Sequence, residues 1–189
     1  EAGPIQKVAL NVTRAVDPSR PVIESSGYFH GVPDPDALDA HDYDQNPETF
    51  GQRHGYGADP YLNAPVPGQH RESKRPWSVP YQGQPYFVSE FGGIWWNPNL
   101  REGESSWGYG DRPTSIETFY ARFEGLCSVL LNNPDMFGYC YTQLTDVYQE
   151  QNGIYTFERN EKFDLERIRR AQQRPAAIEQ RATDTVAER

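Results

Sequence analysis

Segments with the residue pattern of β-strands alternate along this chain with segments of helical periodicity. Strand-like runs lie at residues 21–27, 37–45, 85–91 and 136–143. Helical patterns lie at residues 5–16, 46–54, 114–133 and 164–174. Strands that are separated by helices usually pair in parallel, because each crossover returns the chain to the same end of the sheet. The alternation therefore predicts an α/β fold built on a parallel sheet of four strands.

Three of the helices carry further signals. Asn46 as cap and Pro47 at the first helical position mark the start of one helix, and Thr114 with Glu117 forms a capping box at the start of another. Two helices carry apolar residues at helical spacing. The stripe of the first helix is Ile5, Val8, Ala9, Val12 and Val16, and that of the third is Ile116, Phe119, Tyr120, Phe123, Leu126, Cys127, Leu130 and Leu131.

Polar and aromatic residues gather where each predicted strand ends. In parallel α/β folds, that end of the sheet carries the active site. The four groups, in chain order, are Glu24, Ser25, Ser26, Tyr28 and His30; His41, Asp42, Tyr43 and Asp44; Glu90, Trp95 and Trp96; and Tyr141, Gln143 and Asp146.

The chemistry of these groups favours a neutral ligand that is rich in hydroxyls. Carboxylates accept hydrogen bonds from sugar hydroxyls, and aromatic faces stack on the C–H face of a sugar ring. A phosphate ligand would need a glycine-rich loop with Lys or Arg, and the sequence has none. The net charge of -9 argues against nucleic acid and an anionic membrane as partners. No cofactor and no metal are predicted.

Glu90 is the sharpest candidate for catalysis. It ends the third strand-like run, in PYFVSEFGGIWW, and Gly92 and Gly93 follow it. The glycines allow a sharp turn that leaves the carboxylate unobstructed. A carboxylate at a barrel strand end can attack an anomeric carbon and form a covalent glycosyl intermediate. A structural glutamate held by a salt bridge explains the same pattern, so both interpretations stay open at this point.

The second strand end offers candidate substrate contacts. His41, Asp42 and Asp44 are metal-ligand types, but adjacent side chains of a strand point to opposite faces. We therefore favour hydrogen bonds from His41, Asp42 and Tyr43 to substrate over metal binding. His30 suits either a structural hydrogen bond or a ligand contact.

Further candidates follow the third and fourth strands. Trp95 and Trp96 can form a stacking platform, with at least one of them packed under its loop. Tyr141 and Gln143 share one strand face and can line the mouth of the site, although core filling explains Tyr141 equally well. A serine nucleophile is poorly supported, because the sequence lacks a G-x-S-x-G turn.

The two cysteines, Cys127 and Cys140, stand in apolar surroundings and are predicted to be buried free thiols. Reduced cysteines favour the cytoplasm, with the periplasm left open. The sequence shows no membrane span and no signal peptide. It begins with Glu1 rather than methionine, which suggests a piece of a longer protein.

Five stretches, in this order, resemble the C-terminal half of the catalytic barrel of family 2 glycoside hydrolases, the β-galactosidase and β-glucuronidase type. They are DPSRPVIESSGYFH, HDYDQNPETF, PYFVSEFGGIWW, WGYG and GYCYTQLTDVYQEQNGIYTFERNEKFD. The resemblance implies that the predicted strands are strands five to eight of a (β/α)8 TIM barrel. Residues 1–173 would form that half barrel, and residues 174–189 a frayed polar tail. By the same resemblance Glu90 is the nucleophile, Tyr43 is the tyrosine that contacts it, and Tyr141 stands near the floor of the sugar site.

Two family features are missing. The general acid/base, a Glu that follows Asn at the end of strand four, has no counterpart, since Asn160-Glu161 lies beyond the last predicted strand. β-Glucuronidases clamp the carboxylate of their sugar with Asn-x-Lys, where this chain has Glu150-Gln151-Asn152. The added acid would repel a uronic acid, so a neutral sugar such as galactose is favoured.

The sequence thus predicts a fragment of a retaining β-glycosidase for β-galactoside-like sugars that is inactive alone. Its expected partners are the carbohydrate substrate and either the remainder of a longer protein or a second copy of the chain. A non-catalytic carbohydrate-binding protein is the alternative from another functional class. A truncated product without a role of its own is the third possibility.

Overall fold

A computed structural model describes residues 3–27, 30–57, 79–101 and 103–180. The elements follow one another as α1 (Gly3–Val16), β1 (Leu38–Asp42), α2 (Pro47–His54), β2 (Tyr86–Gly92), α4 (Ile116–Leu131), β3 (Met136–Thr142) and α5 (Leu165–Gln172). A further helical turn covers residues 177–180, inside the segment that was predicted to be a tail.

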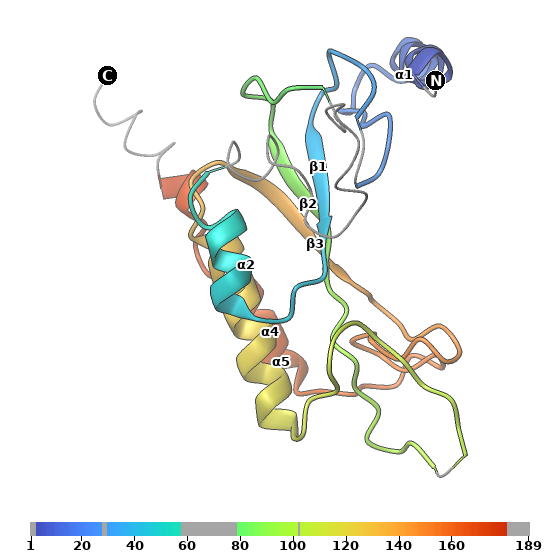
Figure 1. Ribbon diagram of the computed structural model, residues 1–189, viewed down its shortest axis with the longest axis vertical. Coiled ribbons are helices and arrows are strands. Elements are labelled where there is room, and N and C mark those ends of the chain that lie inside the picture. The colour runs from blue at the N-terminus through green and yellow to red at the C-terminus, as the bar shows by residue number, and fades with distance from the viewer. Residues whose placement is uncertain (1–2, 28–29, 58–78, 102, 181–189) are drawn as a thin grey trace, which may run out of the picture.

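The three strands form one parallel sheet in the order β1-β2-β3, which confirms the predicted parallel α/β fold for these elements. Helices α2, α4 and α5 lie together on one side of the sheet, and α1 stands apart from them (Figure 1). The loops that follow β2 and β3 extend beyond the C-terminal ends of the strands. Over the described residues the sheet is open, so only part of the expected barrel is present.

The core lies between the sheet and α4. The apolar stripe predicted for this helix is buried except for Ile116, which is partly exposed, and Phe119, Phe123 and Leu126 have no exposed surface. Phe119 stacks on Phe163 at a centroid distance of 4.0 Å, and its ring centroid lies 6.1 Å from that of Phe123. Since large apolar side chains contribute most to burial, this aromatic cluster is the main source of cohesion in the described part of the chain.

The N-cap of helix α4 lies one residue later than predicted. Ser115, not Thr114, is the N-cap, and its side chain accepts a hydrogen bond from the Thr118 backbone nitrogen at 3.2 Å. The predicted role of Glu117 in a capping box is wrong. Its carboxylate instead forms an ion pair with the Arg167 guanidinium of α5 at 2.7 Å. A tertiary ion pair has therefore replaced the local bond that the sequence suggested.

Helix α2 begins where the sequence predicts. The Asn46 side chain accepts a hydrogen bond from the Glu48 backbone nitrogen at 2.8 Å, and Pro47 occupies the first helical position. At the other end of the helix, Arg53 and His54 reach back toward β1.

The predicted strand at residues 21–27 is wrong, because this segment makes no β-ladder. Side-chain carboxylates bind its backbone instead. The Val22 nitrogen donates to Asp36 Oδ2 at 2.7 Å, and the Gly27 nitrogen donates to Asp39 Oδ2 at 2.9 Å. These acids use the donors that a ladder needs, and β1 remains an edge strand among the described residues.

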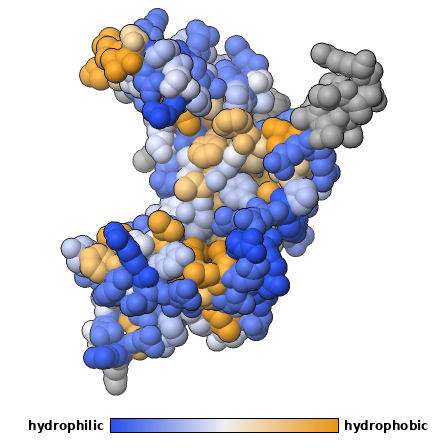
Figure 2. Space-filling view, turned by 180° about the vertical axis from the view of Figure 1, so that it is seen from behind, coloured by the Kyte–Doolittle hydropathy of each residue, from blue (hydrophilic) through white to orange (hydrophobic). Residues whose placement is uncertain are grey.

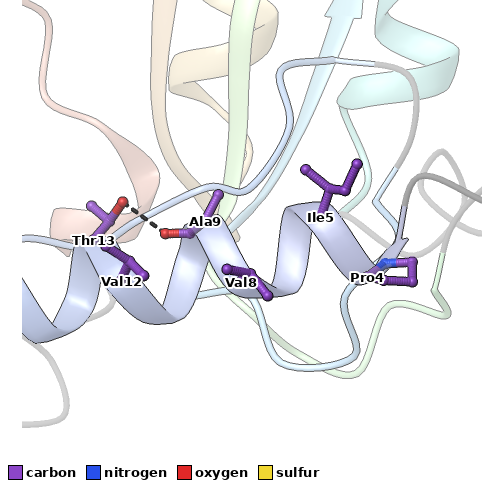
Figure 3. Close-up of a pocket in the computed structure, with 6 residues that line it drawn as sticks. All are labelled: Pro4, Ile5, Val8, Ala9, Val12 and Thr13. Carbon is purple, nitrogen blue, oxygen red and sulfur yellow. Dashed lines mark hydrogen bonds between the residues drawn. The ribbon is translucent and has the colours of Figure 1, made fainter.

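The apolar face of α1 (Pro4, Ile5, Val8, Ala9 and Val12) points to solvent. Ile5 is 78% exposed and Val8 63%. Figure 2 shows a hydrophobic patch on this helix, and Figure 3 shows its side chains along one shallow groove. On this helix only Leu10 is buried.

One of the two cysteines departs from prediction. Both are free thiols, but only Cys127 is buried, whereas Cys140 is exposed. Burial raises the pKa of Cys127 to about 12. Cys140 is exposed because β3 is an edge strand with only one side covered by helices. Among the described residues, no helix is long and apolar enough to cross a bilayer.

Candidate active site

Strand β2 carries a bulge where its acid stands. Val88 and Glu90 pair with consecutive residues of β1, so Ser89 has no opposite residue. A bulge of this kind changes the direction of the neighbouring side chains. Val88 and Phe91 are fully buried in the core, while Ser89 and Glu90 bond to side chains of the other face.

Glu90 is held through one oxygen by two side chains from the β1 end. The Tyr43 hydroxyl donates to Glu90 Oε2. His41 Nδ1 lies 3.3 Å from the same oxygen, and the Glu90 side chain remains 39% exposed. Burial and this bond raise the pKa of Tyr43, so its hydroxyl stays a hydrogen-bond donor. The contact that the resemblance implied between Tyr43 and Glu90 is therefore present.

An aromatic row lies beside this carboxylate. Tyr109 stacks on Tyr43 with ring centroids 3.5 Å apart and planes 6° from parallel. Trp107 meets Tyr109 edge to face at 5.8 Å and is 45% exposed. Since an aromatic face suits the C–H face of a sugar, the row provides an apolar surface next to a reachable acid.

Gly92 and Gly93 adopt the backbone turn that the sequence suggested. Their φ angles are +78° and +58°, in the region that glycine favours. Both positions also lack room for a side chain. A Cβ on Gly92 would lie 2.3 Å from the Tyr141 ring, and one on Gly93 would lie 2.4 Å from the Tyr109 ring.

Replacing Gly92 with alanine is expected to destabilise the chain by about 2–5 kcal/mol, from a left-handed backbone penalty plus overpacking against Tyr141. Gly83→Ala is the matched control, since its φ is also positive at +90° but no atom lies within 4 Å of its added Cβ. We expect only about 1–2 kcal/mol for the control. Urea unfolding followed by circular dichroism measures both, and equal losses would contradict the steric account.

Asp42 has a structural place rather than the expected substrate contact. Its carboxylate accepts hydrogen bonds from Arg53 Nε and lies 2.7 Å from His54 Nε2, so it faces α2. Burial raises the pKa of Asp42, but the bonds from His54 and Arg53 outweigh this and lower it. Strand alternation explains the result, since His41 and Tyr43 face the other side.

His30 is also removed from direct contact with a ligand. Its side chain is 3% exposed and lies between Glu24 and Asp39. These contacts match the structural hydrogen bond, which was one of the two interpretations that the sequence left open for His30.

The two tryptophans after β2 are anchored differently. Trp96 is partly buried against the core, with its ring centroid 6.4 Å from that of Phe119, and its part in a stacking platform stays a prediction. Trp95 donates from Nε1 to Ser106 Oγ at 2.8 Å and lies under the guanidinium of Arg112. These contacts fix the loop that carries Trp107 and Tyr109.

The candidates of the fourth predicted strand, now β3, are also held internally. The Tyr141 ring packs edge to face on Phe91 at 5.5 Å, and its hydroxyl accepts a hydrogen bond from the Ile94 nitrogen at 3.1 Å. The ring is partly buried against the core, and its place near the sugar site stays a prediction. Gln143 donates to Asn152 Oδ1 at 2.8 Å and stays a candidate through that loop.

Sequence reasoning missed three residues around Glu90. They are Asp39, which bonds Ser89; Tyr109, which stacks on Tyr43; and Thr142, whose hydroxyl lies 3.4 Å from that of Tyr43. Ser26, which bonds His41, was named only as one of the polar residues at the first predicted strand end. The strand alternation that links residues 39, 41 and 43 was the signal for Asp39. No local pattern identifies the other two, since Tyr109 comes from the loop after β2 and Thr142 is the last residue of β3.

Comparisons with known proteins bear on the fold. No protein-family model matches the sequence, and no curated protein matches it. Among solved structures, a β-D-glucuronidase of Dictyoglomus thermophilum matches with a TM-score of 0.57 and 14% identity. The fold is shared with part of a glycosidase. The match covers 93% of this chain but only 30% of that enzyme.

Proposed function

We propose that this chain is the part of a retaining β-glycosidase that supplies the nucleophile, Glu90. The observation that carries the proposal is a half-exposed carboxylate at the C-terminal end of the central strand, bonded by Tyr43 and bordered by aromatic rings. The fold shared with a glycosidase supports it. The C-terminal ends of the strands are where barrel enzymes carry their chemistry.

In the proposed reaction, Glu90 acts as an ionised nucleophile. One carboxylate oxygen attacks the anomeric carbon, a C–O bond to the enzyme forms, and the bond to the leaving oxygen breaks. The leaving oxygen takes a proton from a carboxylic acid, which in retaining enzymes stands about 5 Å from the nucleophile. Water later hydrolyses the ester and returns the carboxylate. The protonating acid is proposed to come from βα units outside this chain.

The substrate class proposed is a neutral sugar of the β-galactoside kind. In the loop after β3, Lys162 is 4% exposed and its ammonium lies 2.7 Å from Asp146 Oδ1, so its charge is compensated. Glu150 adds a negative charge and bonds Asn152 at 3.2 Å. A sugar carboxylate would be repelled by Glu150 rather than clamped by a lysine.

The chain on its own is expected to show no turnover of an aryl β-galactoside, because one carboxyl group cannot both attack and protonate. A fluorogenic substrate assay at micromolar protein measures this. Turnover that is abolished by Glu90→Gln would contradict the proposal that the acid lies elsewhere. Binding of galactose without any glycosidase activity, even in a completed barrel, would favour the carbohydrate-binding alternative.

We also propose that the apolar face of α1 packs against neighbouring helices of a completed barrel. That face is exposed here, and the chain matches only 30% of the glycosidase whose fold it shares. Val8 and Val12, at 63% and 56% exposed, lie one turn apart at its centre. Exposed apolar patches commonly mark such contacts.

Val8→Asp should change the stability of this chain alone and of a protein with a complete barrel by different amounts. In this chain alone we expect a change within about 0.5 kcal/mol, since Val8 is at the surface. In a longer protein with a complete barrel, we expect a loss of about 2 kcal/mol or more, from a buried unpaired charge. Thermal unfolding of both proteins measures the contrast, with Lys7→Asp on the same helix as control. Equal shifts in the two proteins would refute the packing.

A further inference from the structure

Five ionisable side chains form a row on the face of the sheet that carries Glu90. Carboxylate and imidazole alternate along it, in the order Glu24, His30, Asp39, His41 and Glu90. The nitrogen–oxygen distances along the row are 3.3, 3.0, 4.0 and 3.3 Å. Two imidazoles thus lie between three acids.

The row is buried at one end and open at the other. Side-chain exposure is 0% for Glu24, 3% for His30 and 1% for Asp39. It rises to 11% for His41 and 39% for Glu90. Charges that are removed from water need compensation close by, so the imidazoles are placed where the acids require positive charge.

Asp39 is the centre of the buried part. Oδ2 accepts from the Gly27 nitrogen at 2.9 Å and from the Ser89 hydroxyl. Oδ1 lies 3.0 Å from His30 Nε2. Burial lowers the pKa of His30, but its contacts with Asp39 and the charge of Glu24 outweigh this and raise it. His30 thus balances the two inner acids.

His41 joins this buried row to the candidate nucleophile. Nε2 is 2.9 Å from Ser26 Oγ and Nδ1 is 3.3 Å from Glu90 Oε2. The ring has little freedom, because even a Cβ on Gly27 would lie 2.6 Å from it. Tyr43 bonds the same Oε2, and no hydrogen bond from the described part of the chain reaches Oε1.

We infer that His41 is a positioning residue that holds the Glu90 carboxylate by its Oε2, which leaves Oε1 for the anomeric carbon. The inference rests on the proposed function for its catalytic meaning. In this arrangement His41 Nδ1 faces Glu90 Oε2 at 3.3 Å, and Nε2 shares a hydrogen bond of 2.9 Å with the Ser26 hydroxyl. Other charged groups facing His41 are Asp39 on its own strand and, through Asp39, His30 and Glu24.

Histidine NMR of this chain tests the inference without any turnover. The four imidazoles are labelled with nitrogen-15 and titrated between pH 5 and 9, with His41 and His70 assigned by His→Gln variants. An imidazolium that pairs with Glu90 should titrate about one pH unit lower, or more, in Glu90→Gln. Reciprocally, His41→Gln should raise the carboxyl midpoint of Glu90 by a similar amount, followed by carbon-13.

Two controls separate this coupling from a general change in structure. His54, on the helix side of the sheet against Asp42, should keep its midpoint in Glu90→Gln. Glu158→Gln removes the same charge at an exposed position and should leave His41 unchanged. An unchanged His41 midpoint in Glu90→Gln, or an unchanged Glu90 midpoint in His41→Gln, overturns the inference. If coupling is present but Glu90 forms no covalent intermediate, only the proposed function fails.

Discussion

Glu90→Gln is expected to reduce kcat by on the order of 10⁴-fold or more in a completed barrel that contains this chain, a barrier increase of about 5.5 kcal/mol. Glutamine keeps the shape of the side chain and its contact with Tyr43, but a neutral amide cannot form the glycosyl ester. Steady-state hydrolysis of an aryl β-galactoside measures the loss.

The control for this substitution is Glu158→Gln, which removes one negative charge at an exposed site. We expect the control to retain kcat within about twofold, because exposed charges far from the chemistry contribute little. A Glu90→Gln enzyme with near-normal kcat would mean that another group attacks the sugar. Unfolding of both variants at equal urea concentration excludes loss of structure as the cause.

Phe119→Ala should be the most damaging change in the core, with a loss of about 3–5 kcal/mol. Phe119 has no exposed surface, and its ring lies 4.0 Å from Phe163 and 5.8 Å from Tyr120, between centroids. Folded domains have only about 5–15 kcal/mol in total, so the variant should unfold at markedly lower urea concentration.

Phe137→Ala is the matched control, because Phe137 is 55% exposed on the edge strand β3. Its expected cost is below about 1 kcal/mol, since little apolar area returns to water. Equal losses for the two phenylalanines would show that the aromatic cluster around α4 does not dominate stability.

Periodicity in the sequence was enough to predict the helices and three of the strands. The stripe around Phe119 and the run before Glu90 are long and regular, so local pattern and tertiary packing agree. The segment at residues 21–27 failed, because Asp36 and Asp39 bind its backbone nitrogens and no rule of spacing predicts such contacts.

Burial could be predicted less well than structure type. The α1 stripe has helical spacing whether or not a partner covers it, so pattern alone could not show that Val8 is exposed. Cys140 is apolar in context, yet its exposure depends on which neighbours β3 has. In both cases the exposure of a side chain depends on the assembled fold and not on the segment alone.

The candidate site also contains residues that the sequence predicted and residues that it did not. Glu90, His41 and Tyr43 followed from strand ends, strand alternation and the family resemblance, and the structure brings them together. The stacking of Tyr109 on Tyr43 was not foreseen, because Tyr109 comes from a loop whose path no local pattern fixes. The bulge at Ser89, which decides where Glu90 points, has no signature in the sequence.

Covalent trapping tests the central claim most directly. A completed barrel that contains this chain is incubated with a 2-deoxy-2-fluoro β-galactoside bearing a good leaving group, digested and analysed by mass spectrometry. We predict one fluoroglycosyl adduct, located on Glu90 and absent from Glu90→Gln. An intact active enzyme that carries no adduct, or one that carries it on another residue, would contradict the role of Glu90 as nucleophile.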